Sequence, residues 1–249
     1  GSPVSISAGN IEISGTGEKS SNLINQGGTI ALAAAGEQGT VIPLQSPPPG
    51  KVNGEFRGAS AQVNANGNGG GRIYISAGDT QLDNASILTD NTGDRDSEGG
   101  ITLSVNGRLD IRNNAAIFSD AYGQGNAGNV AIQAQNCHMD DAMITSETAE
   151  AGDAGDLSLI VIDTLQLVNG ASIFSSTYGM GNAGSVTVNA GRLKLDGSCT
   201  GQFTGIASQA DTGSIGDAGA VMVAVDELVE IKNRAQIFSS TFSLGNAGN

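Results

Sequence analysis

The sequence has few charged residues, few aromatic residues and no tryptophan. Charged residues make up 14% of the chain, against roughly 25% in an average soluble protein, and aromatic residues make up 4%. This composition disfavours a helical bundle or a coiled coil, because those folds need many Leu, Glu, Lys and Arg residues. The apolar residues that are present are mostly small or β-branched, so we expect a thin, aliphatic core.

Basic residues are scarce as well. The 11 Lys and Arg residues against 25 Asp and Glu give a net charge of −14 at pH 7. The chain therefore lacks the basic surface that phosphate binding requires, which excludes nucleic acid as a natural partner and disfavours anionic membranes. No apolar run approaches the ~20 residues of a membrane-spanning helix. The chain opens without a signal peptide, and we interpret it as an excerpt of a longer protein.

Glycine is abundant, with 38 residues, and it marks an internal repeat. Each unit opens with a Gly that is followed by two alternating aliphatic residues. The regular units occupy residues 71–249 and start near Gly71, Gly99, Gly128, Gly155, Gly184 and Gly219. We expect this array to continue beyond the fragment. Residues 1–37 resemble two partial units of the same kind.

Residues 38–70 interrupt the repeat and contain four of the five prolines, in the segment IPLQSPPPG at 42–50. We interpret them as a Pro/Gly-rich insertion that leaves the wall of the fold as an extended excursion. The sequence predicts its return near residues 61–65. A loop that docks a partner is the alternative.

Three short runs in each unit alternate apolar and polar residues with the period of a β-strand, as in 101–105, 109–111 and 115–117. Three such strands cannot bury an apolar face alone, but stacked copies can. The sequence therefore predicts an all-β fold, a parallel β-helix (β-solenoid) with three short strands per rung and about 29 residues per rung. The general preference of parallel crossovers predicts a right-handed coil.

Equivalent positions of successive rungs are expected to lie in vertical files inside the coil. One file of small residues contains Ala115, Ala171 and Ala235, and we place Cys199 in the same file. The neighbouring file of branched residues contains Ile117, Ile173 and Ile237. Small side chains suit the narrow part of such a lumen and branched ones its wider part.

The loop that closes each rung ends in Asn-Ala-Gly or Asp-Ala-Gly. The residues that begin these motifs are Asn126, Asp153, Asn182, Asp217 and Asn246. We expect their side chains to accept backbone N–H groups and turn the chain into the next strand. A column of Ca²⁺ ligands is the alternative, but the nonapeptide GGxGxDxUx typical of calcium-binding rolls is absent.

Aromatic residues recur on alternate rungs. Phe118, Phe174 and Phe238 follow the inward Ile, and Tyr122, Tyr178 and Phe242 come four residues later. We expect the first set to point outward and each Phe to pack against its partner, which anchors the closing loop. The alternative is an exposed aromatic track with a spacing of ~9.6 Å, which suits stacking on glycans. These six residues are the candidate ligand-binding surface.

Other polar candidates are assigned no chemistry. Asp94, Asp96 and Glu98 are expected in a solvated loop, and His138, the single histidine, is expected to face solvent and cannot build a His-based zinc site. Cys137 and Cys199 are expected to be two free, buried thiols, because their stagger along the coil exceeds the reach of a disulfide. We therefore predict no catalytic residues, no metal site and no cofactor.

Two units carry a resemblance to a known family. ASIFSSTYGMGNAGSVTVNAGRLKLDG at 171–197 and AAIFSDAYGQGNAGNVAIQAQ at 115–135 resemble repeats of filamentous-haemagglutinin-like exoproteins. These are two-partner-secretion proteins of Gram-negative bacteria, and the cyanobacterial type is the nearest in character. The resemblance implies a non-catalytic, adhesive rod segment at the extracellular or outer-membrane surface. It also implies export through an outer-membrane transporter barrel and contact with host or neighbouring cells and their glycans.

The competing hypothesis is a polysaccharide-binding or polysaccharide-degrading β-helix protein. Such enzymes usually break the repeat to build a cleft that brings carboxylates and basic residues together. Here the repeat breaks only at residues 38–70 and around 200–204, and we expect little chemistry at either place. If flanking rungs are missing, the stack should also expose unpaired strand edges at its two ends, which favours end-to-end self-association.

Overall fold

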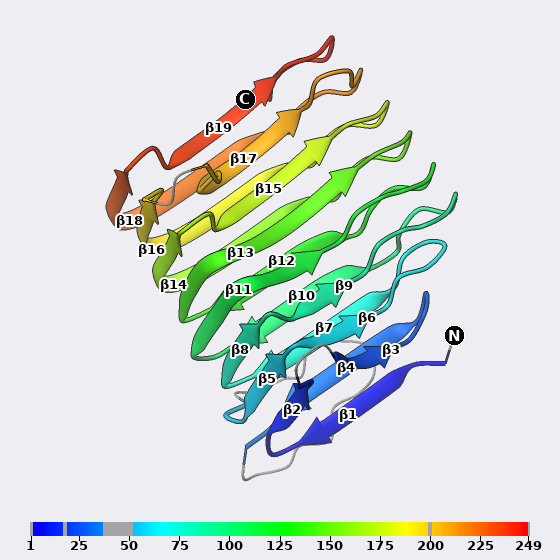
Figure 1. The fold of residues 1–249 in the computed structure, drawn as a ribbon, viewed down its shortest axis with the longest axis vertical. Helices are drawn as coiled ribbons and strands as arrows, with labels where there is room; N and C mark the ends of the chain where they lie inside the picture. The colour runs from blue at the N-terminus through cyan, green and yellow to red at the C-terminus, as the bar shows by residue number, and fades with distance from the viewer. Residues whose placement is uncertain (1, 17–18, 37–51, 199–200, 249) are drawn as a thin grey trace.

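The computed structural model describes residues 2–16, 19–36, 52–198 and 201–248. Within these ranges the regular secondary structure is entirely β, and 19 strands form a single sheet that curls on itself (Figure 1). The pairings between strands are parallel. The chain is therefore all-β with a curled parallel sheet, as in a β-solenoid.

The strands fall into three columns, each of which runs along the length of the molecule. The first column contains β1 (Val4–Ala8), β4 (Thr29–Ala34), β7 (Arg72–Ala77), β10 (Gly100–Val105), β12 (Asn129–Ala134) and the first parts of β14 (Leu157–Val168), β16 (Val186–Asp196) and β18 (Val221–Lys232). The second column contains β2 (Ile11–Ser14), β5 (Glu55–Ala59), β8 (Asp79–Asp83), the first parts of β11 (Arg108–Phe118) and β13 (Asn136–Thr148), and the second parts of β14, β16 and β18. The third column contains β3 (Ser21–Ile24), β6 (Ala61–Asn64), β9 (Ser86–Leu88), the second parts of β11 and β13, β15 (Ser172–Thr177), β17 (Gly205–Ala210) and β19 (Gln236–Thr241).

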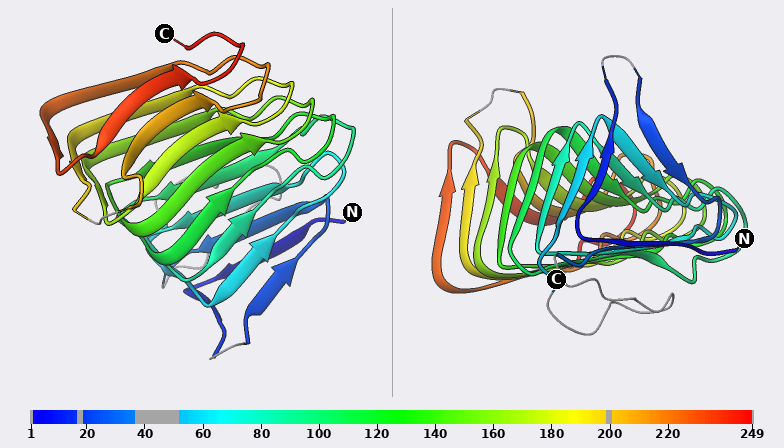
Figure 2. Two further views of the ribbon diagram at one scale, coloured as in Figure 1. Left: turned by 45° about the horizontal axis from the view of Figure 1, so that its top comes forward. Right: turned by 90° about the horizontal axis from the view of Figure 1, so that it is seen from below.

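One strand segment from each column makes a rung, and the rungs stack from β1–β3 at one end to β18–β19 at the other (Figure 1). Seen along the stack, the chain traces a flattened coil (Figure 2). The two termini lie toward opposite ends of the stack. This arrangement makes an elongated molecule with long outer faces.

The core is a set of side-chain files inside the coil. Ile117 pairs in register with Ile144, Ile144 with Ile173, Ile173 with Ile206, and Ile206 with Ile237. The first four of these isoleucines are fully buried. Burying one such side chain contributes roughly 1.5–3 kcal/mol, so repetition along the file stabilises the stack. Ile206 belongs to this file although the sequence pattern does not predict it.

The neighbouring file, which contains Ala115, Ala171 and Ala235, has a different residue than the sequence predicts at one rung. Ser172 pairs with Gly205, so Thr204 follows Ala171 in this file, at the position assigned to Cys199. Thr204 is buried, with 1% of its surface exposed. The insertion before β17 shifts the register by several residues, which the sequence comparison did not place correctly. Cys199 itself lies outside the described residues.

The wall of the coil resumes earlier than the sequence indicated. β5 and β6 lie within residues 38–70 and pair in parallel with the strands on both sides. The wall is therefore re-entered by Glu55, and the first two units each contribute three strands. The alternation was hard to see because Gly58 takes an inward position beside the fully buried Phe56. Residues 42–50 lie outside the described residues.

Asparagine forms the corner between the second and third columns. Asn113, Asn169 and Asn233 have φ values of 57°, 54° and 51°, in the left-handed region that Asn tolerates. The side-chain amide of Asn113 donates a hydrogen bond of 2.8 Å to Asp83 of the preceding rung, and Asn233 donates one of 2.8 Å to Asp196. Asn therefore recurs at this corner, and Ser60 and Asp141, with φ values of 46° and 51°, occupy it on two other rungs.

Glycine is required where the closing loops of successive rungs touch. A Cβ atom on Gly216 would collide with the carbonyl oxygen of Gly181, and one on Gly245 would collide with that of Gly216. These contacts are between backbones, so no side-chain movement relieves them. The close stacking of the loops explains much of the glycine content.

Candidate functional site

The outer face of the third column carries the aromatic residues that the sequence singles out. Phe118 pairs with Thr145, Thr145 with Phe174, Phe174 with Ala207, and Ala207 with Phe238. A half-buried ring therefore lies on every second of these rungs, with a smaller side chain between. Because alanine is so small, the outer face is hollowed between the last two rings.

This hollow is a groove of about 510 Å³. Ser172, Ser176 and Ala207 line it and are buried, so they form its floor. Tyr178 and Met143 also line it and are 47% and 40% exposed, which places them at its sides. The groove thus combines ring faces with small polar groups.

The insertion before β17 supplies one side of the groove. The ring of Phe203 meets that of Phe238 edge to face, with centroids 5.5 Å apart and planes at 65°. The Thr204 hydroxyl accepts a hydrogen bond of 2.8 Å from the Gly170 N–H, which fixes the end of the insertion. Gln202 lines the groove as well. Residues 202–204 thus contribute a ring, an amide and a hydroxyl to the groove and its edge.

The sequence predicts that each Phe packs against the aromatic residue four positions later, but Phe238 packs against a different ring. The ring contact recorded within the described residues joins Phe238 to Phe203, not to Phe242. Tyr122 and Phe242 are 54% and 61% exposed, and Tyr122 is held through its hydroxyl. Phe203 carries no repeat signature, so periodicity alone could not reveal it; the only signal was the break in the repeat itself.

A file of carboxylates runs beside the aromatic file. Asp90 Oδ1 accepts the N–H of Asp120 at 3.1 Å, and Asp120 Oδ1 accepts the N–H of Glu147 at 2.9 Å. Asn66 begins the file, because its Oδ1 accepts the Asp90 N–H at 2.7 Å and its Nδ2 donates to Asp90 Oδ2 at 2.8 Å. Each side chain therefore satisfies the backbone of the next rung. The sequence reading missed this file, since its members share no motif.

Burial raises the pKa of the three carboxyl groups. Desolvation, with the neighbouring charge of Asp120, raises the pKa of Asp90 to about 6. Desolvation, with the charges of Asp120 and Asp211, raises the pKa of Glu147 to about 7. The pKa of Asp120 is raised by burial too. At neutral pH the Glu147 carboxyl group is therefore partly protonated.

Two tyrosines connect the carboxylate file to the closing loops. The Tyr122 hydroxyl donates to Asp120 Oδ2 at 3.2 Å, and the Tyr178 hydroxyl donates to Glu147 Oε1 at 3.3 Å. Burial and the nearby carboxylates raise the pKa of Tyr178 to about 12. Since Tyr178 also lines the groove, Glu147 lies at the border of the groove.

Hydrogen bonds within the file engage most of its carboxyl oxygens. Glycoside hydrolysis by two carboxyl groups needs one proton donor and one available carboxylate. Both oxygens of Asp90 accept hydrogen bonds, and both oxygens of Asp120 do so as well, one of them also from the Thr145 hydroxyl at 3.3 Å. In the described part of this file only Glu147 borders the groove; Asp141, which also lines the groove, belongs to the corner between the second and third columns.

The Asn and Asp residues of the closing loops form a second polar file. Asn126 Oδ1 accepts the N–H of Asp153 at 2.8 Å, and Asp153 Oδ1 accepts that of Asn182 at 2.7 Å. Asn182 Oδ1 accepts the N–H of Asp217 at 2.9 Å, and Asp217 Oδ1 accepts that of Asn246 at 2.6 Å. These bonds are the ones expected for turning the backbone. Among the described residues no group of three or more His, Cys, Asp or Glu could hold a metal ion.

A buried serine file joins the third column to the next rung, and the sequence reading missed it. The Ser175 hydroxyl donates to the Ser146 carbonyl at 2.9 Å and accepts the Gly184 N–H at 2.8 Å. Ser208 repeats this role by accepting the Gly219 N–H at 2.8 Å. The repeated Ile-x-Ser pattern was the available signal.

The remaining candidates have ordinary environments. Asp94, Asp96 and Glu98 are exposed, and Asp96 accepts a backbone N–H of the next rung. His138 lies on the outer side of β13, while Cys137 is buried and free. Burial raises the pKa of the Cys137 thiol to about 12, which suppresses the reactive thiolate.

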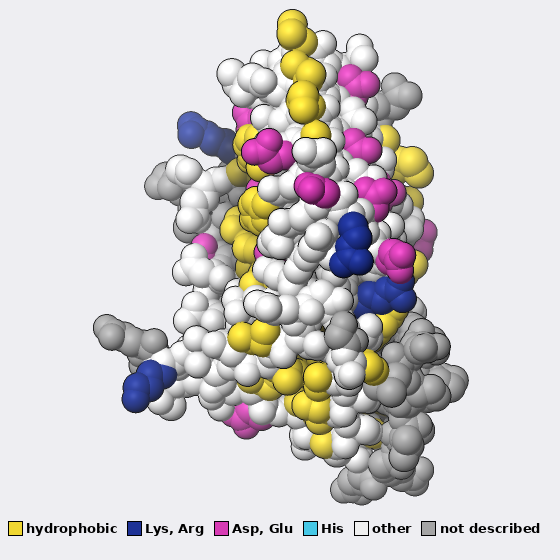
Figure 3. Space-filling model, turned by 90° about the vertical axis from the view of Figure 1, so that its right-hand side faces the viewer, with side chains coloured by type: hydrophobic (Ala, Val, Ile, Leu, Met, Phe, Trp, Pro, Cys, Tyr) yellow, Lys and Arg dark blue, Asp and Glu magenta, His cyan; other side chains and the backbone are white. Residues whose placement is uncertain are grey.

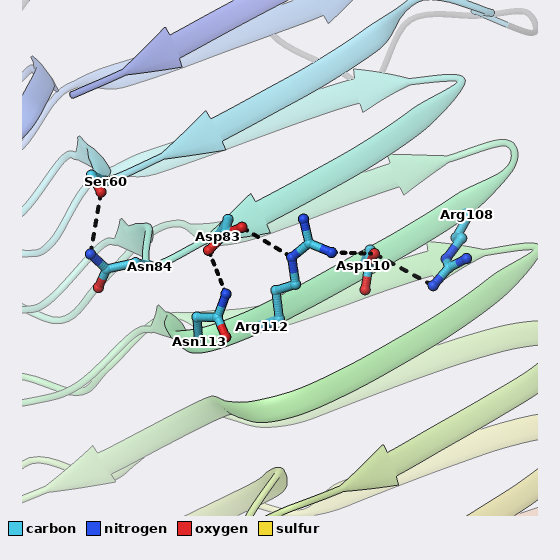
Figure 4. Close-up of polar contacts among 7 residues, drawn as sticks. All are labelled: Ser60, Asp83, Asn84, Arg108, Asp110, Arg112 and Asn113. Atoms are coloured by element: carbon cyan, nitrogen blue, oxygen red, sulfur yellow. Dashed lines mark hydrogen bonds and ion pairs between the residues drawn. The ribbon is translucent and has the colours of Figure 1, made fainter. Parts of the chain in front are cut away.

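Charged residues of both signs gather on the outer face of β8 and β11 (Figure 4). Asp83 contacts the Arg112 guanidinium at 3.0 Å, and Asp110 contacts Arg108 and Arg112 at 3.4 and 3.7 Å. The hydrogen bond from Asn113, together with Arg112, lowers the pKa of Asp83. Exposed pairs of this kind contribute about 0–1 kcal/mol each. The carboxylates here are neutralised by their neighbours.

The face formed by the closing loops carries hydrophobic side chains, with Asp and Glu side chains beside them (Figure 3). Met180, Ile215 and Leu244 of successive loops are 62%, 56% and 90% exposed. Few basic side chains appear on this face (Figure 3). The described residues contain no helix of the length and apolar character needed to cross a membrane.

No family model, curated protein or solved structure matches this chain. The family resemblance therefore depends on the repeat sequences alone. The structure contributes the fold and the geometry of the outer faces.

Proposed function

We propose that this chain is a structural and adhesive rod segment of a large exoprotein of the filamentous-haemagglutinin-like kind, and that it is not an enzyme. In this proposal the curled sheet is a right-handed parallel β-helix with about 29 residues per rung. The rod acts as a stiff spacer that holds contact surfaces away from the cell.

The observation that carries the proposal is the unbroken parallel register of all three columns. In the third column the pairing runs from β3 through every rung to β19 without an interruption. Each rung is therefore held by backbone hydrogen bonds to its neighbours as well as by the buried files. Such a stack resists bending and gives proteases few extended segments to enter.

The repeat resemblance supports the location and export of the parent protein. We infer export through an outer-membrane transporter barrel to the surface of a Gram-negative bacterium, and contact there with host or neighbouring cells. The net charge of −14 supports contact with uncharged surface groups rather than with nucleic acid or anionic lipid.

Adhesion of coated beads tests the proposal. Beads that carry the folded chain should attach to bacterial or epithelial cells and should resist protease treatment. Beads that carry the same chain after denaturation are the control and should not attach. Equal attachment of both, or of neither, would contradict the adhesive role.

A polysaccharide-degrading enzyme is the second candidate, because Asp83 and Asp110 lie beside Arg108 and Arg112 on one outer face. Incubation with uronic-acid polymers measures new reducing or unsaturated ends. We expect no turnover, because these carboxylates are engaged by the guanidinium groups. Reproducible turnover that Arg112→Ala abolishes would replace the rod proposal with the enzymatic one.

End-to-end self-association is a further part of the proposal. Val229 and Ile231 of β18 face inward, yet they are 51% and 46% exposed, because β18 belongs to the last described rung. Where no further rung of the parent protein covers this surface, a second copy would bury it by adding a rung. Sedimentation velocity over a concentration series should show growth of an elongated species, and Val229→Lys should reduce it.

A further inference from the structure

We propose that the groove between Phe174 and Phe238 binds a neutral oligosaccharide, whose sugar rings lie on the aromatic faces and whose hydroxyls bond the amides of Gln202, Gln209 and Gln236. This inference deepens the proposed adhesive function by assigning the contact chemistry to one site. The inference rests on the proposed rod only because the stacked rungs align the residues of the groove.

The groove has the shape of an extended ligand. Phe174 and Phe238 lie two rungs apart in one file, a separation of ~9.6 Å along the stack. That separation and the volume of about 510 Å³ suit two or three linked sugar rings. The small Ala207 between the two rings leaves the space in which the chain of sugars lies.

The rings are held in place before a ligand arrives. Phe203 packs edge to face against Phe238 at 5.5 Å, and the Tyr178 hydroxyl bonds Glu147. Aromatic side chains offer a large apolar face with few rotatable bonds. A sugar that stacks on them therefore orders few side chains, which lowers the entropic cost of binding.

The polar groups of the groove match hydroxyl groups. Gln202 and Gln236 are exposed, and their side-chain amides appear in none of the hydrogen bonds recorded for the described residues. Gln209 donates through Nε2 to Asp211 at 3.0 Å, which leaves its carbonyl oxygen as an acceptor. A side-chain amide offers two N–H donors and one acceptor oxygen. It can therefore both donate to and accept from sugar hydroxyls, which themselves donate and accept.

The charge of the site restricts the ligand to neutral glycans. The lining includes Asp141 and contains no Lys or Arg, and Glu147 borders the groove through Tyr178. A uronate, sulfate or phosphate group would meet carboxyl groups and no cation inside the groove; Arg234 lies in the adjoining hollow, which shares Gln202 and Gln236 with the groove. A neutral chain carries no such penalty.

Glycan binding by the full chain tests the inference. The probes are immobilised cello-, xylo- and manno-oligosaccharides, with oligogalacturonates as acidic comparators. We expect binding to at least one neutral series and none to the acidic series. Phe238→Ala and Gln236→Ala should each weaken binding by about tenfold, which corresponds to one apolar or hydrogen-bonded contact.

Phe118→Ala is the matched control, because Phe118 occupies the same file outside the groove. It should bind as the unaltered chain does, and circular dichroism should show that all variants keep the β fold. Equal loss in Phe118→Ala, or equal binding of acidic glycans, would overturn the inference. So would a dimer that Phe238→Ala dissociates, because a second copy would then be the occupant.

The inference and the proposed function fail separately. If beads attach to cells but no neutral glycan binds, the rod remains adhesive and the groove is not its contact site. If neutral glycans bind but beads do not attach, the site exists without the adhesive role.

Discussion

Replacing Glu147 by Gln should stabilise the protein at pH 8 and leave it almost unchanged at pH 4.5. Burial, with the charges of Asp120 and Asp211, raises the pKa of Glu147 from 4.5 to about 7 in the folded chain. A carboxyl group with a raised pKa binds its proton more tightly when folded than when unfolded. The contribution of the Glu147 carboxyl group to the free energy of unfolding is therefore full below pH 4.5 and is lost as the pH rises through 7.

The size of the effect follows from the shift in pKa. The rise in the pKa of Glu147 from 4.5 to about 7 corresponds to about 3 kcal/mol. Glu147 is only partly buried, so solvent screening reduces this to about 1–2 kcal/mol. For a chain of this length each kcal/mol changes the melting temperature by about 2–4 °C, so Glu147→Gln should melt roughly 2–8 °C higher at pH 8.

Thermal melts by circular dichroism at pH 4.5, 6 and 8 measure this effect. The difference between variant and unaltered chain at each pH removes the contributions of other titrating groups. Glu150→Gln is the control, because Glu150 is exposed and lies three residues further on. A variant that melts lower than the unaltered chain at pH 8, or a gain that is independent of pH, would refute the reasoning.

Three further predictions concern the core, the loops and the thiol. Ile144→Ala should lower the free energy of unfolding by about 2–5 kcal/mol in urea titrations, because it opens a cavity in a fully buried file; a loss below 1 kcal/mol would argue against tight stacking. Asn182→Ala should cost about 1 kcal/mol in the same assay by leaving the Asp217 N–H without its acceptor, and an unchanged midpoint would show that water replaces the bond. In a Cys199→Ser background, Cys137 should react with a thiol reagent only after unfolding, since its thiol is buried and its pKa is raised to about 12; rapid labelling of the native chain would contradict this burial.

Much of the fold could be predicted because the core repeats. Every rung must place apolar side chains at the same inward positions, so the files appear in the sequence as a recurring pattern. Ile117, Ile173 and Ile237 were recognisable for this reason, and the structure places them in one file. Where the pattern weakens, prediction fails: Gly58 at an inward position hid β5, and the insertion before β17 misplaced Cys199.

The candidate site was predictable only in part. Periodicity identified Phe174, Tyr178 and Phe238 as a surface set, because they recur at fixed positions. It did not identify Phe203, which belongs to an insertion, nor Glu147, which stands where the preceding rung has Asp120. These residues contribute through their contacts with neighbouring rungs, which no local motif encodes.

The amino-acid sequence by itself determined the parallel stack, because alternation and recurrence fix which side chains face inward and which residues turn the corners. Only the tertiary structure decided where the outer face is hollowed and which carboxyl groups are desolvated. Both depend on what one rung places beside the next: Ala207 between two phenylalanines opens the groove, and burial between rungs, with the charge of Asp120 on the preceding rung, raises the pKa of the Glu147 carboxyl group.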